Sequence, residues 1–114
     1  MHIYLSGPMR GIKDFNFPAF FEAAKVLEAG GNEVFNPAAR DIEKYGFQIA
    51  KSETGDPKDI SHLGFTLREA MAEDTNKICT WADAIVLLPG WERSKGAVAE
   101  KTLAEALGLD VFYY

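Results

Sequence analysis

The sequence predicts an α/β fold, a small doubly wound parallel sheet of the flavodoxin or Rossmann-like kind with helices on both faces. Short apolar runs alternate with segments of helical periodicity, in the order β-α-β-loop-α-β-α-β. The run AIVLL at residues 84–88 is apolar without alternation, as in a strand that is buried on both faces. Because such crossovers are right-handed, the strands should form one parallel sheet. We expect residues 1–114 to form a single domain.

Residues 3–5 predict a short strand, and residues 6–11 predict a tight loop directly after it. The loop sequence SGPMRG holds two glycines and a proline, so its backbone N–H groups can approach an anion or a sugar. Arg10 could add a guanidinium for a phosphate or a carboxylate. An ordinary turn without a ligand is the alternative, since this glycine spacing is common in turns.

A helix should begin at residues 16–17, because Pro18 suits the first turn of a helix. The glycine pair at residues 30–31 should end this helix. Residues 33–35 predict the second strand, which the Asn-Pro pair at residues 36–37 closes. The apolar stripe of the helix comprises Phe17, Phe20, Ala24 and Leu27.

Residues 38–61 predict a long loop, because they carry many charges, a Gly-Asp-Pro sequence and only scattered apolar side chains. Asp41, Tyr45 and Phe47 could line a site from this loop, and an entirely solvated loop is the alternative. Residues 61–82 should form one long helix, whose start Gly64 could interrupt.

The last third of the chain predicts a strand, a turn, a helix and a final strand. The buried strand at residues 84–88 should end at the Pro-Gly pair 89–90. A helix of about a dozen residues follows, with Ser94 as its N-cap and Gly108 as its stop signal. Residues 111–114 predict the final strand.

Glu100 conflicts with the apolar face of this last helix. At about 100° per residue, Glu100 lies near the middle of the arc that should face the sheet. That arc comprises Gly96, Ala97, Ala99, Leu103, Ala104, Ala106 and Leu107. A carboxylate there needs partners or a proton, because desolvating its charge is expensive. We interpret Glu100 as a site residue at the carboxyl edge of the sheet, where Gly96 leaves room for a ligand. A buried ion pair, or a helix rotated away from this arc, is the alternative.

Asp74 repeats this conflict in the preceding helix. It lies in the middle of an apolar stripe that comprises Leu67, Ala70, Met71, Ile78 and Trp81. Two inward carboxylates can divide the cleavage of a bond, one attacking or stabilising charge and the other positioning or protonating a group. The structural alternatives are an ion pair between Asp74 and Arg68 or Lys77, and a place where the helix overhangs the sheet.

Composition argues against several classes of function. A net charge of −5 provides no basic field, so a nucleic-acid polymer is not an expected partner. Cys79, the single cysteine, suits a reducing cytoplasm and should be a small core residue. Neither a signal peptide nor an apolar run of membrane-spanning length is visible, so no membrane partner is expected. His2 and His62 lack neighbours at ligand spacing, so we expect no metal and no other cofactor.

Three motifs resemble the nucleoside 2-deoxyribosyltransferase-like superfamily, in particular a small branch common in phage and bacterial genomes. The first is YLSGPMRG at residues 4–11, which is similar to the family's opening strand and loop. The second is Asp74, upstream of Ala82 and Asp83, where the next strand begins. The third, SKGAVAE at residues 94–100, matches the pattern Ser-x-Gly-x-x-x-Glu and is the most specific.

The resemblance implies a (deoxy)ribosyltransferase or N-glycosidase of nucleotide metabolism. In the family, the glutamate that matches Glu100 attacks the anomeric carbon, and another base or water replaces the departing base. The acid that matches Asp74 assists near the leaving base and the sugar. A 5′-phosphate is held by the loop that matches residues 6–11 and by the serine that matches Ser94. The implied substrate- and phosphate-binding residues are Tyr4, Ser6, Gly7, Pro8, Met9, Arg10, Gly11, Ser94 and Gly96.

Several alternatives stay open from the sequence. A hydrolase and a transferase share the first half-reaction, which the sequence does not separate. A non-catalytic nucleotide-binding protein, a sensor or sponge that keeps the pocket without turnover, is a second hypothesis from a different class. An interaction module is a third, and it leaves both inward carboxylates unexplained. The expected partner is a small-molecule nucleoside or nucleotide, and the resemblance also implies a homodimer or a larger homo-oligomer.

Overall fold

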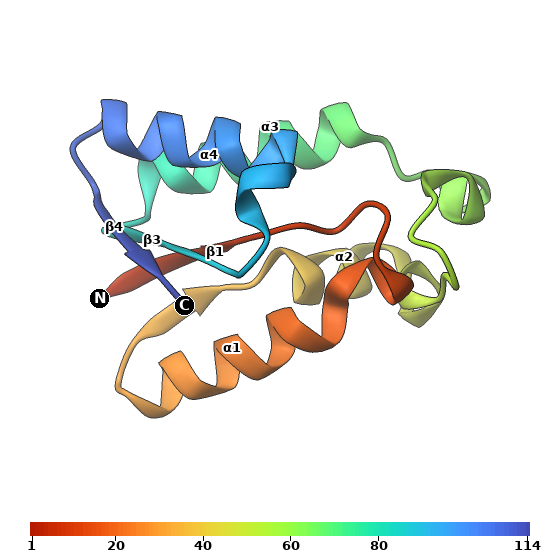
Figure 1. Ribbon diagram of the computed structural model, residues 1–114, viewed down its shortest axis with the longest axis horizontal. Coiled ribbons are helices and arrows are strands. Elements are labelled where there is room, and N and C mark those ends of the chain that lie inside the picture. Colours follow the sequence, from red (N-terminus) through yellow and green to blue (C-terminus); the bar gives the residue numbers. More distant parts are fainter.

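Four parallel strands in the order β2-β1-β3-β4 form the sheet of the computed structural model, which describes all residues, 1–114 (Figure 1). The strands are β1 (His2–Ser6), β2 (Glu33–Phe35), β3 (Ala84–Leu87) and β4 (Asp110–Tyr113). The strand order reverses at β1, because β2 lies on one side of it and β3 and β4 lie on the other. The doubly wound parallel sheet predicted from the sequence is confirmed, and β3 and β4 differ from their predicted ranges by a single residue at their ends.

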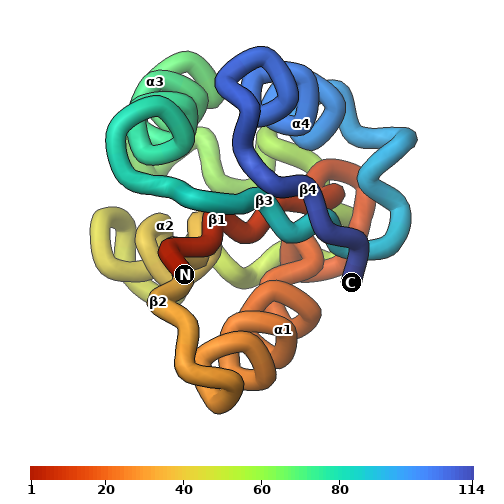
Figure 2. The backbone as a smooth tube through the Cα atoms, turned by 90° about the vertical axis from the view of Figure 1, so that its left-hand side faces the viewer, coloured from red at the N-terminus to blue at the C-terminus, as the bar shows by residue number.

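Helices cover both faces of this sheet. The helices α1 (Phe17–Ala29) and α2 (Pro37–Tyr45) lie on one face, and α3 (Leu67–Thr80) and α4 (Lys95–Ala106) lie on the other (Figure 2). Short 3-10 helices occur in the connections: η1 (Lys13–Asn16), η2 (Phe47–Ala50), η3 (Pro57–Leu63) and η4 (Trp91–Arg93). The structure contains no helix with the length and hydropathy needed to span a membrane.

The alternation of side chains along β1 divides them between two hydrophobic cores. Ile3 and Leu5 join the core formed with α1 and α2. Tyr4 points the opposite way, into the core beneath α3 and α4. Ser6 follows Tyr4 on that side, at the carboxyl end of the strand. Because side chains alternate along a strand, the hydroxyl groups of Tyr4 and Ser6 both face α4.

The helix α2 occupies residues that the sequence assigns to a loop. Asn36 is its N-cap, since the Asn36 side chain accepts a hydrogen bond from the Ala38 N–H, and Pro37 is its first residue. Gly46 ends the helix with a φ of 85°. The Asn-Pro pair that closes β2 is therefore also the start of a helix. The prediction of an irregular segment over residues 38–61 is wrong for its first part.

The helix α3 is shorter than the helix predicted over residues 61–82. Gly64 has a left-handed φ of 83° and ends η3, and α3 begins only after Thr66, whose hydroxyl caps it. Cys79 is exposed, so its prediction as a core residue is wrong. The buried face of α3 passes through the neighbouring Ile78, and adjacent helical positions point about 100° apart.

The helix α4 begins as predicted, with the Ser94 hydroxyl accepting a hydrogen bond from the Ala97 N–H at 3.1 Å. Its buried residues are Ala97, Glu100 and Ala104. Ala99, Ala106 and Leu107, which the sequence places on the buried arc, are exposed. The helix is therefore rotated from the predicted arc, and its buried face runs through Ala97, Glu100 and Ala104. Glu100 lies on the buried face, as predicted.

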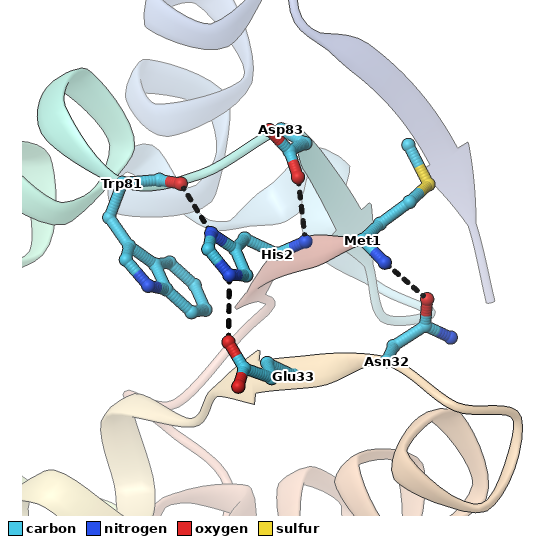
Figure 3. A network of polar contacts seen from close by, with 6 residues as sticks. All are labelled: Met1, His2, Asn32, Glu33, Trp81 and Asp83. Atoms are coloured by element: carbon cyan, nitrogen blue, oxygen red, sulfur yellow. Dashed lines mark hydrogen bonds and ion pairs between the residues drawn. The ribbon is translucent and has the colours of Figure 1, made fainter.

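A polar network joins the chain at the amino ends of the strands (Figure 3). The His2 ring stacks on Trp81 with ring centroids 4.5 Å apart, and its Nε2 lies 2.7 Å from Oε2 of Glu33. The backbone N–H of His2 donates a hydrogen bond to the Asp83 carboxylate at 2.8 Å. These contacts link β1, β2 and the connection between α3 and β3, so they help to keep the strands in register.

The segment between α2 and α3 is attached to the loop after β1. The Gly11 N–H donates a hydrogen bond to the Gly55 carbonyl at 3.0 Å, and the Ser52 N–H donates one to the Asp14 carboxylate at 3.0 Å. A Cβ on Gly55 would lie 2.3 Å from a backbone oxygen of the loop, so this approach requires glycine. Residues 46–66 thereby extend over the end of the molecule toward which β1 points (Figure 1).

Candidate functional site

A cavity of about 940 Å³ opens at the carboxyl ends of β1 and β3. Its walls come from β1 and the following loop, α2, the 46–66 segment, α3, η4 and α4. Ligands bind at this position in doubly wound sheets, because the connections on the two sides of the strand reversal diverge there. The residues predicted to be catalytic, or to bind the substrate and its phosphate, all line the cavity: Tyr4, Ser6, Gly7, Pro8, Met9, Arg10, Gly11, Asp74, Ser94, Gly96 and Glu100.

Glu100 is the most buried acid of this cavity, with a relative exposure of 6%. The Tyr4 hydroxyl donates a hydrogen bond to Oε2 of Glu100 at 2.8 Å, and the Ser6 hydroxyl donates one to Oε1 at 2.6 Å. Both donors come from the face of β1 that α4 covers. The central strand therefore fixes both oxygens of the carboxylate.

Burial and the hydroxyl donors have opposite effects on the pKa of Glu100. Burial raises the pKa of Glu100, and the hydrogen bonds from Ser6 and Tyr4 oppose that rise by favouring the carboxylate. Burial, with the charges of Glu100 and Asp74, raises the pKa of Tyr4 well above its usual value. The Tyr4 hydroxyl consequently keeps its proton and acts as a donor.

Asp74 faces the same cavity from α3. Burial, together with the charges of Glu100 and Asp41, raises the pKa of Asp74 to about 8, although the Tyr4 hydroxyl partly opposes this shift. Asp74 thus favours its protonated form at neutral pH, whereas Glu100 receives the hydrogen bonds that favour an anion. Two acids whose environments differ in this way are suited to separate acid and base roles.

Neither cavity acid takes part in an ion pair. Asp74 pairs with neither Arg68 nor Lys77, and the Lys77 ammonium lies over the Trp81 ring instead. Glu100 likewise has no cation within ion-pair distance. The ion pairs considered as structural explanations of these residues are therefore absent.

The loop after β1 packs closely against the end of β3. A Cβ on Gly7 would lie 2.7 Å from Cβ of Leu88, so a glycine is needed at this contact. The Gly11 N–H is already bonded to the Gly55 carbonyl, and it is not available to an anion as the sequence suggests. Arg10 is exposed at the rim of the cavity, where its guanidinium can reach a ligand.

Ser94 and Gly96 lie at the start of α4, on the edge of the cavity. Because the Ser94 oxygen accepts a hydrogen bond from the Ala97 N–H, its own proton can be donated to a ligand. A Cβ on Gly96 would meet only Sδ of Met71 and Oγ of Ser94, each at 3.9 Å. The open space predicted beside Gly96 is therefore present.

Three further cations line the cavity and have no signal in the sequence. Lys58, Arg93 and Lys95 join Arg10 among the lining residues. Lys95 has the periodicity of a solvent-facing residue, and the other two lie in η3 and η4, where no motif predicts a site. Only the folded arrangement of the loop after β1, η3, η4 and α4 brings the four side chains to one cavity.

Asp41 lines the cavity, whereas Tyr45 and Phe47 do not. Tyr45 packs edge-on against a neighbouring aromatic ring, and Phe47 is 76% exposed. A helix that begins at Pro37 places Asp41 one turn later on the same face. Recognition of Asn36 as an N-cap would therefore have placed Asp41 on a helix and Phe47 beyond its end, although the same spacing does not separate Asp41 from Tyr45.

A family model matches residues 1–113, which is almost the entire chain, and its description is Domain of unknown function (DUF4406). The chain belongs to the DUF4406 family. No curated protein and no solved structure gave a match.

The cavity of this DUF4406 domain combines Glu100, whose carboxyl group accepts two hydrogen bonds, with Asp74, whose raised pKa favours the protonated form, and with a cationic rim. A carboxylate can stabilise or attack a carbon that gains positive charge, while a nearby acid protonates the group that leaves. The rim can hold an anionic part of the same ligand. The His, Cys, Asp and Glu side chains of the DUF4406 domain form no cluster that could hold a metal ion.

Proposed function

We propose that this DUF4406 domain cleaves or transfers the N-glycosidic bond of a nucleoside or a nucleoside 5′-monophosphate, with Glu100 as the nucleophile. The observation that carries the proposal is the buried Glu100 carboxylate, which has no cation and receives hydrogen bonds from Tyr4 and Ser6 inside the cavity. A simple binding site for an anion gains nothing from such a group. A sugar carbon that becomes cationic is stabilised by it. The likeness of residues 94–100 to nucleoside 2-deoxyribosyltransferase-like enzymes supports the same reaction.

The proposed reaction has two half-reactions. In the first, a Glu100 oxygen attacks the anomeric carbon, and the bond from this carbon to the base nitrogen breaks. The electron pair of that bond leaves with the base, which takes a proton from Asp74. In the second, water or another base attacks the same carbon and gives a proton back to Asp74, and Glu100 departs as a carboxylate.

A 5′-phosphate would lie at the rim formed by Arg10 and Ser94. The Ser94 hydroxyl has a proton to donate, and the N-terminus of α4 favours a negative charge beside it. Arg93 and Lys95 add positive charge to the same rim. We therefore propose a 5′-monophosphate as the better substrate, because a nucleoside leaves these groups without a partner.

Release of free base from a panel of ribo- and deoxyribonucleosides and their 5′-monophosphates tests the proposal. We expect the Glu100→Ala variant to lose at least about a thousandfold in rate, as is usual when a nucleophile is removed. The matched control is Glu105→Ala, on the same helix, where the glutamate is exposed and pairs with Lys101 at 3.0 Å. This control should retain the wild-type rate.

Binding of the same compounds to Glu100→Ala separates an enzyme from a binding protein. Retained binding with no base release supports the enzyme. A wild-type protein that binds one compound tightly but releases no base, even with an acceptor base present, overturns the proposal. The non-catalytic nucleotide-binding protein then becomes the better hypothesis. Where release occurs, the formation of a new nucleoside with an acceptor base separates a transferase from a hydrolase.

A further inference from the structure

Asp41 is a cavity acid that the proposed reaction does not use. It lies on α2, is half-buried, and lines the same cavity as Asp74 and Glu100. The structure gives the Asp41 carboxylate neither a hydrogen bond nor an ion pair, although cations lie nearby on its own helix. Because no buried side-chain polar atom lacks a partner, the unbonded Asp41 oxygens stay accessible, and at the cavity they can accept a hydrogen bond from a donor that a ligand brings.

Ion pairs between α2 and α3 hold Asp41 in this position. Arg40, the residue before Asp41, binds Glu73, the residue before Asp74, with Nη2 and Oε2 2.9 Å apart. The other cation of α2, Lys44, lies 3.8 Å from a further acid of α3. Both cations of α2 are thus directed to α3. Asp41 and Asp74 each follow one member of the Arg40–Glu73 ion pair, and both line the cavity.

The strand order gives the cavity two sides. The helix α2 follows β2, on one side of β1, and brings Asp41. Arg93 and Ser94 follow β3, on the other side of β1. Glu100 lies between these sides, because Tyr4 of β1 holds it. A substrate with its anomeric carbon at Glu100 and its phosphate at Ser94 therefore directs its base toward Asp41.

We propose that Asp41 binds an amino group on the base of the substrate, so that the site selects amino-bearing bases such as adenine and cytosine over their keto counterparts. This inference rests on the proposed function, because the position of the base follows from that of the sugar at Glu100. A carboxylate accepts a hydrogen bond from an amino group. A keto base presents an oxygen at the same position, which the carboxylate repels.

The electrostatics of Asp41 fit this role. Burial and the charge of Glu73 raise the pKa of Asp41 to about 7, against the opposing effect of Lys44 and Arg40. The carboxylate is therefore easily formed at neutral pH, and an amino donor in the cavity favours it further.

Matched nucleotide pairs test this inference. Adenosine and inosine 5′-monophosphates, and cytidine and uridine 5′-monophosphates, differ at the amino position of the base. For wild-type protein we expect kcat/KM to be at least about tenfold higher for the amino member of a pair. Asp41→Ala should lower kcat/KM for the amino members by about 10- to 100-fold and change kcat/KM for the keto members by less than about threefold. Glu43→Ala, an exposed change on the same helix, should leave the ratio as in wild type.

A second variant keeps the test valid if Asp41→Ala fails to fold. The amide of Asp41→Asn can donate a hydrogen bond to a keto oxygen, so its preference should shift toward inosine and uridine nucleotides. Equal rates for both members of each pair in wild type, or a preference that Asp41→Ala and Asp41→Asn retain, would overturn the inference.

Binding measurements distinguish a failure of this inference from a failure of the proposed function. The same pairs are titrated into Glu100→Ala with and without Asp41→Ala. If wild type releases no base but the amino compounds bind more tightly in a manner that depends on Asp41, the glycosidic reaction fails and the assignment of Asp41 stands. If base is released without any amino preference, the reaction stands and the assignment fails.

Discussion

Glu100 is an acid that lies in the protein interior without a cation, and hydroxyl donors oppose the effect of its burial. Its oxygens receive hydrogen bonds of 2.8 and 2.6 Å, and hydrogen bonds to a charged group are about twice as strong as neutral ones. Loss of one donor would leave the charge desolvated and less well compensated, so the pKa of Glu100 would rise. The hydroxyls of β1 are thereby linked to the pH dependence of any reaction that needs the anion.

Tyr4→Phe should move the acid limb of the pH profile upward. The variant removes the hydrogen bond to Oε2 that lowers the pKa of Glu100, so the carboxylate forms only at higher pH. A hydrogen bond to a charged group contributes about 1.5 to 3 kcal/mol, and we expect a shift of about one to two pH units in kcat/KM for base release. The exposed Tyr114→Phe is the control. An unchanged profile in Tyr4→Phe would show that Tyr4 does not tune Glu100.

Asp74→Asn should stabilise the protein at alkaline pH while lowering activity. The folded pKa of Asp74 is about 8, above the usual 3.8, so the folded state binds the extra proton between these values. Stability attributable to Asp74 therefore falls as pH rises from about 4 to 8, and an uncharged Asn removes this loss. We expect Tm at alkaline pH to rise by about 3 to 6 °C, which corresponds to about 1 kcal/mol.

The melting temperature measured across this pH window checks the Asp74 prediction. Below about pH 4 the variant and wild type should converge, because Asp74 is then protonated in both the folded and the unfolded chain. The exposed Asp110→Asn should reproduce the wild-type pH dependence. Parallel curves for wild type and Asp74→Asn would mean that burial does not penalise the Asp74 charge.

At the scale of elements, α3 and α4 each begin with a hydroxyl side chain that caps the helix N-terminus. Thr66 accepts a hydrogen bond from the Glu69 N–H, and Ser94 accepts one from the Ala97 N–H, but only Ser94 lines the cavity. Thr66→Ala and Ser94→Ala should each lower the free energy of unfolding by about 1 kcal/mol. Only Ser94→Ala should also weaken nucleotide binding. Calorimetric titration of both variants with a nucleoside 5′-monophosphate checks this, and equal affinities would confine Ser94 to its capping role.

The elements also show what sequence reasoning can and cannot supply. Proline and glycine signals predict the ends of α1, and Ser94 as an N-cap predicts the start of α4, because the effect of these residues on the backbone is local. The helix α2 was missed because the Asn-Pro pair at its start serves equally well to close a strand. The exposure of Cys79 was missed for a different reason, since helical rotation of a few tens of degrees depends on packing against the sheet.

The sequence predicts those site residues whose polarity disagrees with the apolar face of the helix that carries them. Glu100 and Asp74 were found because an acid interrupts an apolar face, and the structure places both at one cavity. Lys58 and Arg93 could not be found in this way, since a cation in a short surface helix violates no local rule. Their place at the cavity depends on contacts between segments far apart in the chain, such as the bond from Gly11 to Gly55.

At the scale of the whole molecule, the two ends of the sheet differ in character. The amino end is joined by the His2 network, with ring stacking and backbone contacts (Figure 3). The carboxyl end carries the cavity, with acids on α2, α3 and α4 and cations on the 46–66 segment and η4. Both ends depend on β1, the strand that lies between β2 and β3 and contributes residues to each.

The four rim cations belong to a chain whose net charge is −5, and this contrast has a kinetic consequence. The net charge of the chain repels a diffusing anion, whereas Arg10, Lys58, Arg93 and Lys95 place positive charge at the cavity, so the anion should be steered toward it. Counterions screen such attraction beyond about 8 Å at physiological ionic strength. We expect the association rate of a nucleoside 5′-monophosphate, measured by stopped flow, to fall several-fold as added salt rises from about 20 to 500 mM. A neutral nucleoside should show no such dependence, and the difference between the two slopes would measure how far the local field at the rim outweighs the global charge.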